Sequence, residues 1–93
     1  MTSKALRWVA LTATGEVLDR PGRLYYVRLA ATGAASAILR DSADATGPVL
    51  LGLALAAAGA DDWPKAPVSL NFLHGLHATL TGTATLSVGW ETD

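Results

Sequence analysis

The sequence predicts an all-β protein, a small antiparallel β-sandwich of the jelly-roll or immunoglobulin-like kind with about seven or eight short strands. The first observation is that turn-forming residues divide the chain at short intervals, with Thr-Gly pairs at 14–15, 32–33, 46–47 and 81–82. The second is that most segments between the turns alternate apolar and polar residues or are rich in β-branched and aromatic residues, as strands are. The third is the length of 93 residues, which fits a single domain spanning 1–93.

Composition predicts that the chain buries part of its surface against another copy or a partner. A chain this short buries only about 60–65% of the surface that its unfolded form exposes, and the absence of cysteine excludes disulfides. Charged residues make up 16% of the chain, whereas about 25% is usual. Oligomerisation is the remaining way for such a small fold to gain stability, and we expect it.

Charge and hydropathy argue against nucleic-acid and membrane partners. The net charge is −1, so the basic surface that attracts phosphates is missing. The longest apolar run, Val49 to Ala60, has 12 residues, whereas a membrane-spanning helix needs about 20. The apolar patch after Lys4 and Arg7 is interrupted by Thr12 and Thr14, which does not fit a signal peptide.

In the first part of the chain we predict a strand at Lys4 to Ala13 and a short continuation at Glu16 to Asp19. Alternation places Leu6, Trp8 and Ala10 on one face of the first strand, with Arg7, Val9 and Leu11 on the other. Arg20 to Arg23 contains Pro-Gly and is predicted to be a turn. The residues of this region leave open whether the first strand pairs within its own subunit or with a neighbour.

The segment Arg23 to Ala31 is predicted to be a strand because aromatic and β-branched residues favour a pleated surface. Simple alternation separates its residues into two faces: Tyr25, Val27 and Leu29 on one, and Leu24, Tyr26, Arg28 and Ala30 on the other. Ala35 to Arg40 is predicted to be its hairpin partner. Each Thr-Gly pair is interpreted as closing a strand, with glycine supplying the positive φ that hairpin turns require.

The middle of the chain contains an ambiguous apolar run. After the polar loop Asp41 to Pro48, the run Val49 to Ala58 fits either a strand or a helix, because leucine and alanine favour helix and periodicity does not separate buried helices from buried strands. We predict a strand over Val49 to Leu55, because the neighbouring segments are all β and Gly52 weakens a helix. Ala57 to Pro67 is predicted to be a long turn.

The stretch Ala66 to Trp90 is predicted to carry the framework of the fold. It is interpreted as three strands, at 68–72, 76–80 and 84–90, with turns set by Gly75 and Gly82. The candidate core residues from this stretch are Leu70, Phe72, Leu76, Leu80, Leu86 and Val88.

No catalytic or metal-binding pattern is recognisable, so we expect neither an enzyme nor a cofactor. His74 and His77 would point to opposite faces of a strand, and no third ligand is adjacent. The spacing of Asp41 and Asp44 is wrong for a calcium loop, and Asp61-Asp62 has no apparent acid–base partner. The chain also has no cysteine, no nucleophile elbow and no phosphate-binding glycine loop.

Aromatic residues and histidines are the candidate interface residues. They are Trp8, Tyr25, Tyr26, Trp63, His74, His77 and Trp90. Aromatic side chains in loops suit protein interfaces and sugar stacking. For Trp63, display on the surface and closure of one end of the sandwich are alternatives.

The chain resembles a class of small tailed-bacteriophage virion proteins over roughly residues 24–91. The resemblance lies in turn chemistry and strand alternation at Ala37 to Asp41, Gly47 to Leu50, Pro67 to Phe72, Gly75 to Ala78, Leu80 to Gly82 and Leu86 to Glu91. It implies a β-sandwich displayed on the virion, as a capsid decoration or head-fibre-like subunit that is commonly a homotrimer. No catalytic residues come with it.

From this resemblance we expect a structural protein that is made in the bacterial host cytoplasm and binds the major capsid protein lattice on the surface of the virion. The alternative is a glycan- or receptor-binding β-sandwich module of a phage tail or fibre. A small hydrolytic or metal enzyme is a further, less favoured alternative.

Overall fold

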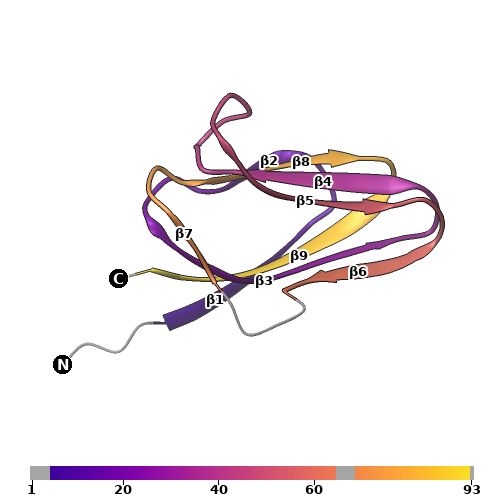
Figure 1. The fold of residues 1–93 in the computed structure, drawn as a ribbon, viewed down its shortest axis with the longest axis horizontal. Helices are drawn as coiled ribbons and strands as arrows, with labels where there is room; N and C mark the ends of the chain where they lie inside the picture. The colour runs from indigo at the N-terminus through magenta and orange to yellow at the C-terminus, as the bar shows by residue number, and fades with distance from the viewer. Residues whose placement is uncertain (1–4, 65–68, 93) are drawn as a thin grey trace.

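A computed structural model describes residues 5–64 and 69–92, which form two packed layers of strands (Figure 1). Within these residues there are nine strands and no helix, which confirms the predicted β-sandwich. The strands are β1 (Ala5–Leu11), β2 (Gly15–Leu18), β3 (Gly22–Ala31), β4 (Ala35–Arg40), β5 (Val49–Leu55), β6 (Gly59–Trp63), β7 (Leu70–Phe72), β8 (Leu76–Thr81) and β9 (Ala84–Thr92). The ambiguous apolar run therefore contains a strand over the predicted residues.

The strands are divided between two antiparallel sheets. The five-stranded sheet, here called sheet A, has the order β1-β9-β3-β6, and β7 also pairs with β3. β6 and β7 pair with different ends of β3, so they lie end to end along the same edge. The four-stranded sheet, sheet B, has the order β2-β8-β4-β5. The first strand thus pairs with β9 of its own chain, which answers a question that the sequence left open.

Most connections cross from one sheet to the other, and among residues 5–64 and 69–92 only β4 and β5 form a hairpin between neighbours in the chain. The prediction that Ala35–Arg40 is the hairpin partner of β3 is therefore wrong, because β4 pairs with β5 and β8 in the other sheet. The interpretation of every Thr-Gly pair as a hairpin turn is also wrong. Of these four glycines, Gly82 alone has a positive φ, of 86°. Crossing between layers lets consecutive strands bury their apolar faces against each other.

The predicted long turn at residues 57–67 contains an additional strand, β6, and its last three residues lie outside the described part. Asp61 and Asp62 hid this strand from sequence analysis because aspartate is depleted in strands. β6 lies at the edge of sheet A, where charged side chains are common because they discourage pairing with other chains.

Both sheets contribute to one core between the layers. The buried hydrophobic residues are Leu24, Val27, Leu29, Ala35, Ala37, Leu39, Leu53, Phe72, Leu76, Ala78, Ala84, Leu86 and Val88. Of the six predicted core residues, four are buried, whereas Leu70 and Leu80 are partly buried and pack against the core.

A shift of register in β3 corrects the predicted faces of that strand. The pairing with β9 is irregular between Leu24 and Tyr26, so an extra residue enters the strand and its side chains change face there. As a result Leu24 joins Val27 and Leu29 in the core, and Tyr25 lies outside it together with Tyr26.

Asp41 ties the loop between β4 and β5 to the turn between β7 and β8. Its carboxylate accepts hydrogen bonds from the backbone N–H groups of Leu73, at 2.9 Å, and His74, at 2.8 Å. Burial raises the pKa of Asp41, but the hydrogen bonds from His74 and Leu73 and the charge of His74 together lower it below its ordinary value. Next to this turn, Gly75 has a φ of 148°, and a Cβ there would lie 2.8 Å from the carbonyl oxygen of Leu18.

No helix in the described residues is long and apolar enough to cross a membrane.

Replacing Leu86 by alanine should lower the free energy of unfolding by about 3 kcal/mol, because the side chain is fully buried and its loss leaves a cavity. Leu6→Ala is the matched control. Leu6 is 52% exposed, so this change should cost less than about 1 kcal/mol. Urea unfolding followed by circular dichroism measures both, and equal losses would contradict the assignment of the core.

Asp41→Asn should destabilise the protein in a pH-dependent way. Because the folded-state pKa of Asp41 is lowered, its carboxylate stabilises the fold above the unfolded pKa of about 3.9, and this contribution is lost as the pH falls through the folded value. We expect the variant to lose about 2 kcal/mol at neutral pH and the difference from the wild type to shrink in acid. Urea unfolding across this pH range tests it, with the exposed Asp19→Asn as control, and a constant difference would refute it.

Candidate functional site

The outer face of sheet A carries exposed apolar side chains. In β1, Leu6 and Trp8 point away from the core and are 52% and 56% exposed. Val9 and Leu11, from the other face of the strand, pack against the core, as alternation predicts. A tryptophan that is more than half exposed on a rigid sheet is available to contact a partner.

Gly89 makes room for Trp8. The two residues are paired across β1 and β9, and a Cβ at Gly89 would lie 3.0–3.1 Å from three ring atoms of Trp8. The indole can therefore lie across β9 towards Tyr26 of β3, which is paired with the same glycine. The two ring centroids are 5.3 Å apart with the planes tilted by 56°, which is a favourable arrangement for aromatic pairs.

Polar contacts join β3 to β6, the neighbouring strand of sheet A. The hydroxyl of Tyr26 donates to Oδ1 of Asp62 at 2.9 Å, and Arg28 forms an ion pair with the same oxygen at 3.3 Å. The neighbouring Tyr26 and then the charge of Asp62 raise the pKa of Arg28. We use the name aromatic face for the outer surface formed by Leu6, Trp8, Tyr25, Tyr26, Arg28 and Asp62.

A chain of weaker contacts borders the aromatic face at one end. Arg23 Nε donates to Oδ1 of Asn71 at 3.0 Å, and Arg23 Nη1 lies 3.5 Å from the hydroxyl of Tyr25. That hydroxyl in turn lies 3.5 Å from Oε1 of Glu91. These contacts join β7, β3 and β9 and orient the polar side chains beside the aromatic rings.

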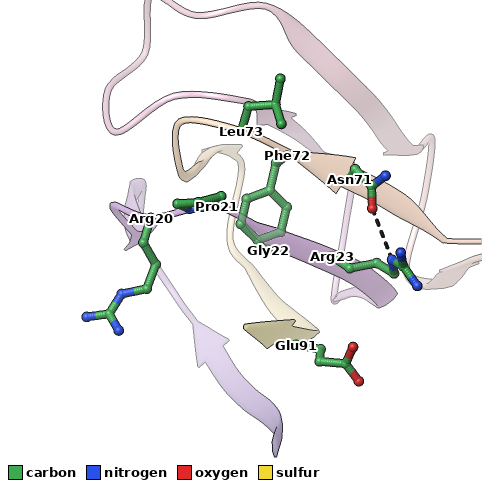
Figure 2. Close-up of a pocket in the computed structure, with 8 residues that line it drawn as sticks. All are labelled: Arg20, Pro21, Gly22, Arg23, Asn71, Phe72, Leu73 and Glu91. Atoms are coloured by element: carbon green, nitrogen blue, oxygen red, sulfur yellow. Dashed lines mark hydrogen bonds between the residues drawn. The ribbon is translucent and has the colours of Figure 1, made fainter. Parts of the chain in front are cut away.

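Arg23, Asn71 and Glu91 also line a pocket of about 310 Å³ (Figure 2). Its lining residues are Arg20, Pro21, Gly22, Arg23, Asn71, Phe72, Leu73 and Glu91. Figure 2 shows the ring of Phe72 beside Gly22, with Arg20 on one side and the Arg23–Asn71 hydrogen bond on the other. Gly22 fits this contact because a Cβ there would lie 2.8 Å from Cζ of Phe72. Cationic, amide and carboxylate groups around an apolar floor suit noncovalent binding of a polar group.

The structure brings together some of the candidate interface residues and separates others. Trp8, Tyr25 and Tyr26 share the aromatic face. Trp63, at the end of β6, and Trp90, in β9, are partly buried and pack against the core. Of the two alternatives for Trp63, this position favours closure of one end of the sandwich over display on a surface loop.

The two histidines are not part of the aromatic face. His74 is exposed in the turn between β7 and β8, where the predicted strand boundaries place it, and its Nδ1 lies 3.7 Å from Oδ1 of Asp41. His77 is buried in β8, in sheet B. It is paired with Arg40 of the neighbouring strand β4. The Nδ1 atom of His77 and the Nη1 atom of Arg40 are both buried without a hydrogen-bond partner.

No group of three or more His, Asp or Glu residues in the described part of the chain is arranged to hold a metal ion.

Sequence reasoning missed Gly89 and the Arg28–Asp62 pair. A glycine inside an alternating strand is a usable signal, because it often marks close approach of a large neighbour. For Arg28 and Asp62 no such signal exists, since their contact depends on the pairing of β3 with β6, and β6 was interpreted as a turn.

Comparisons with known proteins do not identify the chain. No family model matches it, and no curated protein matches it in sequence. A functional assignment therefore has to be argued from the sequence and the geometry described above.

The position of Trp8 over β9 gives a prediction for NMR spectroscopy. The Hα protons of Gly89 should be shifted upfield by the indole ring current, because the ring occupies the space where a Cβ would lie. In Trp8→Leu this shift should disappear while the amide shifts of sheet B remain unchanged. Ordinary Gly89 shifts in the wild type would contradict the packing of Trp8 across β9.

Proposed function

We propose that the protein is a structural virion protein that binds a bacteriophage capsid as a homo-oligomer, a homotrimer in the simplest form, and decorates or stabilises the shell. The observation that supports it best is the aromatic face, where Trp8 and Leu6 are more than half exposed on a paired strand. The proposal places the protein on the capsid surface after its synthesis in the host cytoplasm.

The composition of the aromatic face suits a protein partner. Tryptophan, tyrosine and arginine are the residues that most often dominate binding energy at interfaces, and all three lie together here. The Arg28–Asp62 ion pair and the Tyr26 hydroxyl are positioned by neighbouring strands, so little order has to be gained on binding. A flat, ordered surface of this kind can dock on a repetitive shell.

The mechanism requires no reaction. A protein that binds only the assembled lattice stabilises it by mass action, and the stabilisation grows with the logarithm of the ratio of its free concentration to its dissociation constant. Two features support this mechanism. Charged residues make up only 16% of the chain, which suits a protein that buries surface against its own copies and the capsid. Residues 24–91 also resemble small phage virion proteins in turn chemistry and strand alternation.

The direct test mixes purified protein with empty phage capsids and measures co-sedimentation and the melting temperature of the shells. We expect binding and a raised melting temperature, because Trp8 and its neighbours bury their exposed surface on the lattice. Trp8→Ala should weaken binding at least about tenfold, which corresponds to about 1.4 kcal/mol. Because the change also removes the Trp8–Tyr26 ring contact, which contributes about 1 kcal/mol to stability, binding is measured at a temperature where unfolding curves show that both proteins are fully folded.

Leu73→Ala is the matched control, because Leu73 is also exposed, at 68%, but lies outside the aromatic face. It should bind shells like the wild type. Absence of binding by the wild type would refute the proposal, and undiminished binding by Trp8→Ala would refute the role of the aromatic face.

A glycan- or receptor-binding module of a tail or fibre is the second candidate. It is favoured by the Trp8–Tyr26 pair, since sugar rings stack on aromatic side chains, and by the hydrogen-bonding groups of Arg28 and Asp62 beside it. Glycan binding by the isolated protein that is lost in Trp8→Ala, together with no affinity for capsids, would establish this candidate instead.

A further inference from the structure

The sandwich has four sheet edges, and two of them are protected against pairing with another chain. β2 has four residues, carries Glu16 and is irregularly paired. The edge formed by β6 and β7 is interrupted between the two strands and carries Asp61 and Asp62. Short length, irregular pairing and charge are the usual devices that keep an edge strand from adding a further strand.

The other two edges, β1 and β5, are longer and almost free of charge, although the pairing of β5 with β4 is irregular near Leu50. Each has seven residues. β1 contains one charged residue, Arg7, and β5 contains none, and neither contains proline. The side chains of Trp8 and Val49 are 56% and 59% exposed on them. Such long, apolar edges present unpaired backbone groups to any complementary strand.

The two open edges lie on opposite sides of the molecule. β1 is at one end of sheet A and β5 is at the far end of sheet B, and β5 packs next to β6, the opposite edge of sheet A. On the β1 side, an opening of about 440 Å³ between the sheets is lined by residues of β1, β2 and β9. One copy can therefore present β1 in one direction and β5 in the other.

No contact or backbone angle within the chain requires residue 52 of β5 to be glycine. Its φ is not positive, and a Cβ would meet a single atom within 4 Å, the carbonyl oxygen of Ala37 at an ordinary 3.7 Å. Glycine weakens a strand interior and often marks the close approach of another chain. Gly52 is the middle residue of β5, and Trp8 is the middle residue of β1.

We infer that β1 of one copy pairs with β5 of the next, with Trp8 opposite Gly52, so that the copies close into a ring. This inference rests on the oligomer in the proposed function and names its interface. The ring of Trp8 lies over Gly89 and towards Tyr26 of its own chain, so it leans away from the free edge of β1 and leaves that edge open to a neighbouring strand.

Symmetry favours this pairing over two-fold contacts. If β1 paired with β1 of a second copy, β5 would stay open, and if both edges paired with themselves, the copies would form an open filament. A contact between two different edges is heterologous and closes into a ring when the rotation allows. It covers both open edges with one kind of interface.

Gly52→Val tests the inference without weakening the subunit. Valine favours strands, and the space at Gly52 is open within the chain, so the circular dichroism spectrum should be unchanged. The added side chain fills the space at Gly52 where the neighbouring chain approaches closely, and sedimentation velocity should show an oligomeric wild type and a monomeric variant. Thr81→Val, on the exposed end of β8 in the same sheet, is the control and should remain oligomeric.

Cross-linking identifies the paired edges, because the chain has no cysteine of its own. Ala10→Cys and Ala54→Cys place thiols at exposed positions of β1 and β5. A mixture of the two variants, treated with a bis-maleimide that spans about 14 Å, the separation of residues 10 and 54 along antiparallel strands with Trp8 opposite Gly52, should give 10–54 links by mass spectrometry. Links of the 10–10 or 54–54 type instead would overturn the inference in favour of two-fold pairing.

The outcomes separate this inference from the proposed function. An oligomeric Gly52→Val variant would overturn the β1–β5 interface alone. A wild type that is monomeric at all concentrations would overturn the interface and the proposed oligomer together. Binding to capsid shells is measured independently, so its failure would refute the proposed function whatever the oligomeric state.

Discussion

The pairing of β3 with β9 is the interaction on which the rest of the structure depends. It runs from Ala31 opposite Ala84 to Arg23 opposite Glu91 and joins segments that are distant in the sequence. Its inner side supplies the largest part of the core of sheet A, including Val27, Leu29, Leu86 and Val88, which are fully buried. β1 and β6 are then added on its two sides.

The outer side of the same pairing organises the candidate surface. Gly89 of β9 receives the ring of Trp8 from one neighbouring strand, and Tyr26 of β3 bonds to Asp62 of the other. At the end of the pairing, Arg23 and Glu91 border the pocket. The core, the aromatic face and the pocket are therefore all built on the β3–β9 pair. For this reason, the effect of a surface substitution on binding should be measured together with its effect on the free energy of unfolding.

Local patterns in the sequence were enough to predict most strands, but not their partners. The alternation in β1 and the turn at Gly75 follow from side-chain periodicity and backbone sterics. Pairing depends on contacts between distant segments, so β4 was placed beside β3 although it lies in the other sheet. The extra residue at Tyr25 exchanged the expected faces of Leu24 and Tyr25, and aspartates hid β6. Of the site, the aromatic residues of the face were predicted from their type, whereas Gly89, Asp62 and the pocket depend on the register.

The central claim is that one copy of this chain leaves two strands open and that assembly completes them. Hydrogen–deuterium exchange of the wild type, above and below its assembly concentration, measures this directly, since amides of an unpaired edge exchange faster than paired ones. The account predicts that protection rises on assembly in both β1 and β5 and in no other edge strand. Protection that is the same at both concentrations, or that rises at β2 or β6 instead, would contradict it.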